Sequence, residues 1–227
     1  MVVGLRIYYA TRCMARLFIA TPFMIFAPSL RSQARKVCLA VALLGGALAF
    51  SAFADVKPEG LITAARSQIG VTLTYDATYR DLPYPGGDVP KEMGVCTDVI
   101  VRAFREQGMD LQKAVHEDMA RNFSEYPKKW GLAKPDTNID HRRVPNLMTY
   151  FRRQGWAQPV SQKAEDYAPG DLVTWNVDPG ARPHVGIVSD RKTVAGVPLI
   201  LHNIGNGAQE EDILFQYPIT GHYRVRK

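Results

Sequence analysis

Apolar residues recur every three or four positions in three stretches of the chain, which is the spacing of one helix face. These stretches are 61–69, 99–107 and 144–154, and a glycine follows each of them. Glycine commonly lies just past a helix end, so the pattern predicts three helices, the last of them capped by Asp140. A fourth stretch, 111–130, is predicted to be helical in part, with a break at Pro127.

The C-terminal third changes to short runs rich in β-branched and aromatic residues. Strands are predicted at 171–175, 184–189 and 197–204, and further strands at 213–217 and 222–225. Helices followed by successive strands that are joined by turns indicate an α+β fold with an antiparallel sheet.

Residues 1–54 have the build of a leader. A positive segment precedes an apolar run at 37–50, and Ala52-Phe53-Ala54 is a small-x-small cleavage signature. This order predicts a signal peptide that is cleaved after Ala54, which places the protein in the periplasm or outside the cell. A membrane anchor is the alternative, although the run is short for a span and two glycines interrupt it. Met14 or Met24 is an alternative start.

Charge is distributed unevenly between the leader and the remainder. Six of the 28 Lys and Arg residues lie in 1–54, which has no acidic residue, so 22 remain against 22 Asp and Glu. A formally neutral remainder gives no reason to expect nucleic acid as a partner, and the leader is the only contact expected with a membrane. Residues 55–227 are the size of a single domain, which we expect to be a monomer without a cofactor.

Cys96 is the only cysteine in residues 55–227, since Cys13 and Cys38 lie in the leader. It follows a loop rich in Gly and Pro and precedes a predicted helix, so it is expected in the first helical turn. Unpaired backbone N–H groups and the helix dipole favour a thiolate there. A buried, inert cysteine is the alternative interpretation. We predict that Cys96 is a nucleophile.

A cysteine nucleophile needs a base and a group that orients the base. His184 opens one predicted strand and His202 lies late in the next, so antiparallel pairing can bring the two rings together. His141 is the rival, in the polar segment 140–143, which is either a helix cap or a corner that binds carboxylates. Zinc bound by Cys96, His184 and His202 is a further possibility, but no typical metal-ligand spacing occurs, and we predict no metal.

The order of these segments resembles the NlpC-type cell-wall cysteine peptidases. The matching segments are the Cys96 helix, 169–173, 184–188 and 201–202. The resemblance implies a papain-like fold with N-terminal helices packed on an antiparallel sheet, Cys96 as nucleophile, His184 as base and His202 as third member. It also implies that Tyr84 helps to shape the oxyanion site.

Longer strings resemble the YijF-like bacterial envelope proteins, a domain-of-unknown-function family numbered 1287. They are 84–88, 94–98, 138–146 and 202–205, within a resemblance from about 61 to 224. Because of this resemblance, the interpretation of one segment as a helix cap becomes less favoured, and its residues are expected at a substrate site: Asp140, His141, Arg142 and Arg143.

Departures from the NlpC-type pattern affect the expected substrate choice more than the cysteine chemistry. Asp-Cys-Ser-Gly is replaced by 95–98, Val-Cys-Thr-Asp, and Asn203 is an alternative to His202 as the orienting group. Tyr75 is an alternative to Tyr84 at the oxyanion site. The sequence thus predicts an exported cysteine hydrolase that acts on amide or peptide bonds of peptidoglycan stem peptides. A non-catalytic wall-binding protein on the same fold and a thioester acyltransferase are the alternatives.

Overall fold

The structure of the protein is a computed structural model that describes residues 55–178, 180 and 182–226. The predicted signal peptide, its cleavage site and the alternative starts lie outside the described residues. Within the described part, no helix has the length and apolar character that crossing a membrane requires.

In the part of the chain that the structure describes, four α-helices form where the apolar periodicity predicts them, with bounds that differ by a few residues. They are α2 (Pro58–Arg66), α3 (Cys96–Glu106), α4 (Leu111–Arg121) and α5 (Val144–Arg153). Three short 3-10 turns lie between the larger elements: η1 (Phe123–Glu125), η2 (Asp140–Arg142) and η3 (Ala164–Asp166). The expected cap of α5 is corrected, because its N-cap residue is Arg143, while Asp140 begins η2.

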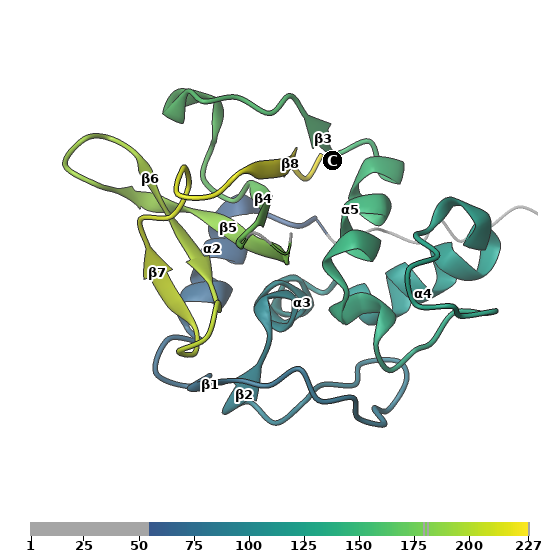
Figure 1. Cartoon of the computed structure of the whole chain (residues 1–227). Coiled ribbons are helices and arrows are strands. Elements are labelled where there is room, and N and C mark those ends of the chain that lie inside the picture. Colours follow the sequence, from purple (N-terminus) through teal and green to yellow (C-terminus); the bar gives the residue numbers. More distant parts are fainter. Residues whose placement is uncertain (1–54, 179, 181, 227) are drawn as a thin grey trace, which may run out of the picture. The chain divides into compact units, whose positions relative to one another are not determined.

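The main sheet has six strands, and every neighbouring pair is antiparallel (Figure 1). Their spatial order is β3 (Ala157–Gln158), β8 (Ile219–Tyr223), β4 (Leu172–Asn176), β5 (Pro183–Lys192), β6 (Pro198–His202) and β7 (Gln209–Glu211). A separate parallel pair joins β1 (Thr74–Tyr75) to β2 (Met93–Gly94). The predicted α+β class, with N-terminal helices packed on an antiparallel sheet, is confirmed.

One predicted strand is wrong. Residues 213–217 form a turn, and the strand that pairs with β6 is Gln209–Glu211. Ile213 and Leu214 are buried because the turn covers a hydrophobic cluster, and the Leu214 carbonyl accepts a hydrogen bond from Trp175 Nε1 at 3.0 Å. The apolar run therefore reflects burial without strand pairing.

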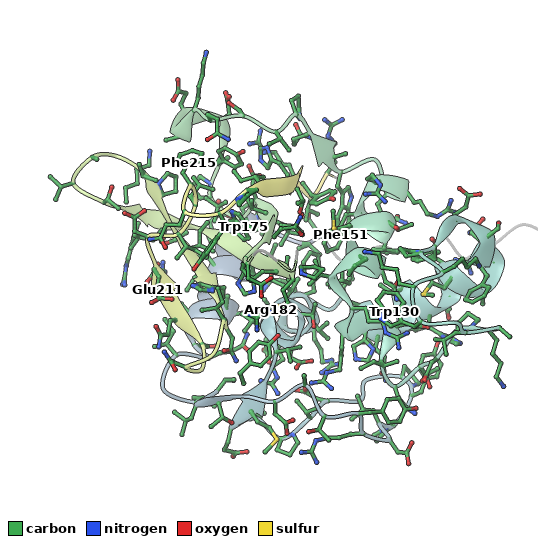
Figure 2. All side chains as sticks on the ribbon, viewed as in Figure 1. Trp130, Phe151, Trp175, Arg182, Glu211 and Phe215 are labelled. Carbon is green, nitrogen blue, oxygen red and sulfur yellow. The ribbon has the colours of Figure 1, made fainter. Side chains whose placement is uncertain are left out.

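Side chains that alternate along the strands feed two separate hydrophobic clusters. Ile187 and Leu201 join the cluster that the helices form, in which the rings of Phe151 and Trp156 stack 5.5 Å apart. Val188, Trp175 and other residues one position out of phase join the second cluster. Figure 2 labels Trp175 of this cluster and Phe151 of the first. This period of two is what a sheet covered on both faces requires.

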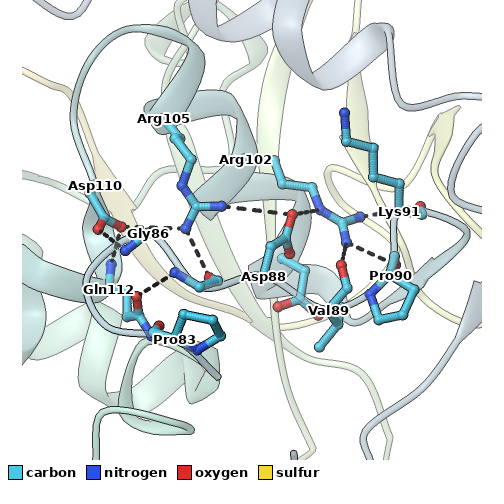
Figure 3. Close-up of polar contacts among 12 residues, drawn as sticks. Pro83, Gly86, Asp88, Val89, Pro90, Lys91, Arg102, Arg105, Asp110 and Gln112 are labelled. Carbon is cyan, nitrogen blue, oxygen red and sulfur yellow. Dashed lines mark hydrogen bonds and ion pairs between the residues drawn. The ribbon is translucent and has the colours of Figure 1, made fainter. Parts of the chain in front are cut away.

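Arg102 on α3 anchors the loop that leads into β2 and Cys96 (Figure 3). Its guanidinium donates to Asp88 Oδ2 at 2.8 Å and to the Thr72 hydroxyl at 2.9 Å. It also donates to four backbone carbonyls of the loop, those of residues 89, 90, 91 and 93. Only 10% of the side chain is exposed, so Arg102 is a buried donor to this loop; the carbonyls of Pro90 and Lys91 also accept from the Met93 N–H and the Thr72 hydroxyl.

Replacing Arg102 with methionine is expected to lower the free energy of unfolding by about 3 kcal/mol, because Asp88 loses the closer of its two arginine partners and several loop carbonyls lose a buried donor. Urea unfolding measures the change. Arg191→Met is the control, since its salt bridge to Glu210 is 63% exposed on the arginine side, and a loss below about 1 kcal/mol is expected. Equal losses in the two variants would contradict the assigned role of Arg102.

Candidate active site

Cys96 is the first residue of α3, as the sequence predicts. The preceding residue, Val95, is extended, and its backbone N–H donates to Asp98 Oδ2 at 2.6 Å, which closes the first helical turn. The thiol is 2% exposed, and the backbone N–H of Val185 in β5 points at the sulfur, as do those of Cys96 and Thr97. The sulfur therefore lies against the β5 backbone, one residue from His184.

The ionisation of Cys96 differs from the prediction. Burial raises the pKa of the thiol to about 12, and the Asp98 carboxylate acts in the same direction. The three N–H groups lower the pKa, but their effect is smaller than that of burial. The free energy of removing a thiolate from water exceeds the stabilisation that these hydrogen-bond donors give it. Cys96 is consequently a neutral thiol in the resting protein.

The rings of His184 and His202 meet, as pairing of β5 with β6 allows. His184 Nε2 lies 3.0 Å from His202 Nδ1, and the ring planes are nearly perpendicular at 85°. Both residues are buried, and burial lowers the pKa of His184 to about 3 and that of His202 to about 4. Two neutral imidazoles thus share one hydrogen bond in the resting protein.

Cys96 lines a cleft of about 350 Å³. The other lining residues come from the β1 region, the segment before α5 and the start of β5: Tyr75, Ala77, Val95, Lys129, Trp130, Ile139, Arg142, Arg143, Val144, Pro145 and Pro183. Lys129 and Trp130 are site residues that the sequence reasoning missed, because they lie in a polar loop without a motif.

The two tyrosines proposed for the oxyanion site have different places. The Tyr75 hydroxyl interacts with the Cys96 sulfur, and burial together with that sulfur raises the pKa of Tyr75. Tyr84 packs its ring against His116 of α4, with 5.0 Å between ring centres, and is not among the described residues that line the cleft. The structure therefore brings Tyr75, and not Tyr84, to the thiol.

The two arginines proposed for the substrate site also differ. Arg142 is buried and binds Asp98 with two parallel hydrogen bonds, of 2.9 and 3.0 Å, so most of its donors are used within the protein. Arg143 lies with its guanidinium 4.2 Å from the centre of the Trp130 ring, and its hydrogen bond to Asp140 uses one donor. Arg143 and Lys129 are thus the cations that the cleft offers to a ligand.

His184 and His202 are not among the described residues that line the cleft, and neither are the candidates Asp140, His141 and Asn203, which support the framework around it. Asp140 accepts hydrogen bonds from the Asp136 N–H and from the side chains of Arg143 and Asn146. His141 is 2% exposed. The Asn203 amide donates to the Gly94 carbonyl at 2.9 Å, which ties β2 to the end of β6, so that His202 and not Asn203 contacts His184.

Burial of His141 makes stability depend on pH. Burial lowers the pKa of His141 from 6.5 to about 4. Between pH 6.5 and 4, His141 is therefore protonated in the unfolded chain and neutral in the folded protein. The free energy of unfolding is expected to fall as the pH drops from 6.5 to 4, with up to about 3 kcal/mol due to His141. Urea midpoints at several pH values check this, and His141→Gln is expected to fall less steeply than the wild type. Parallel curves would contradict it.

Zinc bound by Cys96, His184 and His202 is the alternative use of these side chains. Among residues 55–178, 180 and 182–226, no three His, Cys, Asp or Glu side chains are grouped so that they could hold a metal ion.

Comparisons with known proteins give the following matches. A family model described as "Domain of unknown function (DUF1287)" matches residues 62–225. The "Uncharacterized protein YijF" of Escherichia coli (strain K12) is 59% identical over 160 residues, which cover 70% of this chain and 78% of that protein. Solved structures of NlpC1 and NlpC2 from Trichomonas vaginalis align with 73% of this chain at 13% identity, with TM-scores of 0.40 and 0.37. This chain spans 44% and 46% of those two proteins, less than half of each.

Proposed function

Because this chain belongs to the DUF1287 family, whose description leaves the function open, we propose an activity from the site itself: hydrolysis of amide or peptide bonds in peptidoglycan stem peptides. The observation that carries the proposal is the thiol of Cys96, which begins a helix and opens on a cleft, beside the strand that holds His184 in contact with His202. A nucleophile, a base and a group that orients the base are the parts that thiol-dependent acyl transfer needs.

The reaction starts from the neutral pair. His184 takes the Cys96 proton as the sulfur attacks the carbonyl carbon, so a C–S bond forms while the carbonyl π electrons move to oxygen. Collapse of this intermediate breaks the C–N bond, and the His184 imidazolium gives its proton to the leaving amine. Water, deprotonated by His184, then cleaves the thioester and releases a carboxylic acid.

The developing oxyanion needs donors that already face it. The Cys96 backbone N–H and the Tyr75 hydroxyl both lie at the reacting sulfur and can supply such hydrogen bonds. One such donor is worth about 3 kcal/mol in the transition state. Arg143 and Lys129, on the wall of the same cleft, would bind a carboxylate of the stem peptide.

The test is digestion of defined muropeptides, followed by mass spectrometry. The wild type is expected to give two fragments whose summed mass exceeds the substrate by one water, and Cys96→Ala is expected to give none. Equal product profiles would remove the proposal. Fragments joined to an added amine would indicate an acyltransferase, and binding without cleavage that persists in both Cys96→Ala and His184→Ala would indicate a wall-binding protein.

Export is part of the same proposal, since peptidoglycan lies outside the cytoplasmic membrane. The leader pattern predicts that the protein recovered from the periplasm or the medium begins at Asp55. N-terminal sequencing of that protein checks the prediction. An intact leader on the recovered protein would favour the membrane anchor instead.

A further inference from the structure

Glu211, on the edge strand β7, extends the histidine pair by one member. Its carboxylate oxygen Oε2 lies 2.9 Å from Nε2 of His202. That nitrogen is buried and makes no well-aligned hydrogen bond to any described residue, so Glu211 approaches it closely without being aligned with it. The Glu211 side chain is 40% exposed, so its carboxylate has room to turn onto the ring N–H. No sequence pattern points to Glu211, because it lies in a polar segment without the alternation that predicts a strand.

The pairing of strands explains why this side chain reaches His202. Glu211 stands opposite Ile200, and Gln209 stands opposite His202. Ile200 and His202 are two residues apart on β6 and therefore point to the same face of the sheet, so Glu211 is a diagonal neighbour of His202 on that face.

The donor and acceptor roles in these contacts indicate which ring nitrogens of His202 and His184 carry protons. A carboxylate only accepts, so His202 must carry its proton on Nε2 to bind Glu211, which leaves Nδ1 without one. His202 Nδ1 consequently accepts from His184 Nε2, at 3.0 Å, so the proton of His184 is on Nε2. The remaining nitrogen of His184, Nδ1, is thereby the unprotonated one.

We propose that Glu211 is a positioning residue that holds both histidines in the Nε2–H form and so keeps Nδ1 of His184 available as a base. The inference rests on the proposed function, in which His184 takes the Cys96 proton. Without Glu211, nothing described prevents His202 from carrying its proton on Nδ1 and donating it to His184 Nε2. His184 would then be protonated on Nδ1 and unable to accept a proton there.

The negative charge of Glu211 has a second effect during the reaction. When His184 becomes an imidazolium, its positive charge is buried, and the charge on Arg182 disfavours it further. A carboxylate 2.9 Å from the far end of the histidine pair opposes both effects by its charge, which acts through the hydrogen bond that the two rings share. Glu211 therefore favours the same proton arrangement before and during proton transfer.

Nitrogen NMR of the isotope-labelled full chain near neutral pH tests the proton positions directly, because two-bond couplings distinguish the ring tautomers. The wild type is expected to show His184 and His202 as Nε2–H forms. Glu211→Ala is expected to show Nδ1–H forms of both rings, whereas Glu165→Ala, at an exposed glutamate of η3, is expected to match the wild type. His202 as the Nδ1–H form in the wild type, or unchanged spectra in Glu211→Ala, would overturn the proposal.

A charge-neutral variant and an activity measurement complete the test. Glu211→Gln keeps an acceptor oxygen, so it is expected to retain the tautomers while slowing muropeptide cleavage, and Glu211→Ala is expected to slow it roughly 10- to 100-fold. If the wild type shows the Nε2–H tautomers but cleaves no muropeptide, the proposed function is wrong and the tautomer assignment is still supported. If the wild type cleaves muropeptides and Glu211→Ala cleaves them at the same rate, the proposal for Glu211 is wrong and the proposed function is unaffected.

Discussion

Replacing His184 with alanine is expected to lower the rate of muropeptide cleavage by roughly 10³-fold or more, as much as Cys96→Ala does. The reason is the resting state of the nucleophile. Since burial raises the pKa of Cys96 to about 12, almost no thiolate exists at neutral pH, and the sulfur cannot attack unless a base removes its proton. The rate of product formation, followed by chromatography of the fragments, measures the effect.

The double variant Cys96→Ala/His184→Ala sharpens this prediction. Residues that act as one unit lose activity together, so the double variant is expected to be no slower than either single variant. His116→Ala is the matched control, because His116 is partly buried on α4 and contacts Tyr84 away from the lining of the cleft, and near wild-type turnover is expected. A His184→Ala protein that still cleaves at a tenth of the wild-type rate would remove His184 as the base.

Replacing Asp98 with alanine is expected to lower the free energy of unfolding by about 3–5 kcal/mol, because the change leaves the charge of Arg142 buried and unpaired. The side chains of Arg142 and Asp98 are only 2% and 4% exposed. Asp98 also accepts the Val95 N–H that begins α3, so its loss frees a buried donor at the turn that carries Cys96. Urea unfolding followed by circular dichroism measures the change.

Two further variants separate the buried charge from the general effect of losing an acidic residue. Asp98→Leu combined with Arg142→Met removes both charges and is expected to be more stable than Asp98→Ala alone. Asp178→Ala breaks a pair with Arg182, which is 72% exposed, and is expected to cost less than about 1 kcal/mol. A loss of that size in Asp98→Ala would contradict the structural role of the Asp98–Arg142 pair.

Asp98 also shows how one departure from a family pattern is compensated. The resemblance to NlpC-type peptidases places a glycine at this position, and the sequence alone linked the change to substrate choice. In the structure the carboxylate holds Arg142, whose other donors reach the carbonyls of Asp76 and Thr78. The pair therefore fixes η2 and the segment after Tyr75 to the first turn of α3, on two sides of the cleft.

Features that depend on neighbours along the chain follow from local residue patterns. The spacing of apolar residues predicted the four helices and most strands, because the buried side of a helix or strand recurs at a fixed interval along the chain. The same reasoning placed Cys96 at a helix start, and put His184 and His202 on strands whose pairing brings the rings within 3.0 Å. These inferences need no knowledge of distant segments.

The protonation states of those residues and their contacts depend on how distant segments pack together. The pKa of Cys96 depends on how completely segments far apart in sequence exclude water, so a helix start predicted a thiolate where burial gives a thiol. The selection of Tyr75 over Tyr84, the engagement of Arg142 by Asp98 and the approach of Glu211 to His202 all join residues from different elements. Periodicity reports which side of an element is buried, but partners and desolvation are set by what packs against that side.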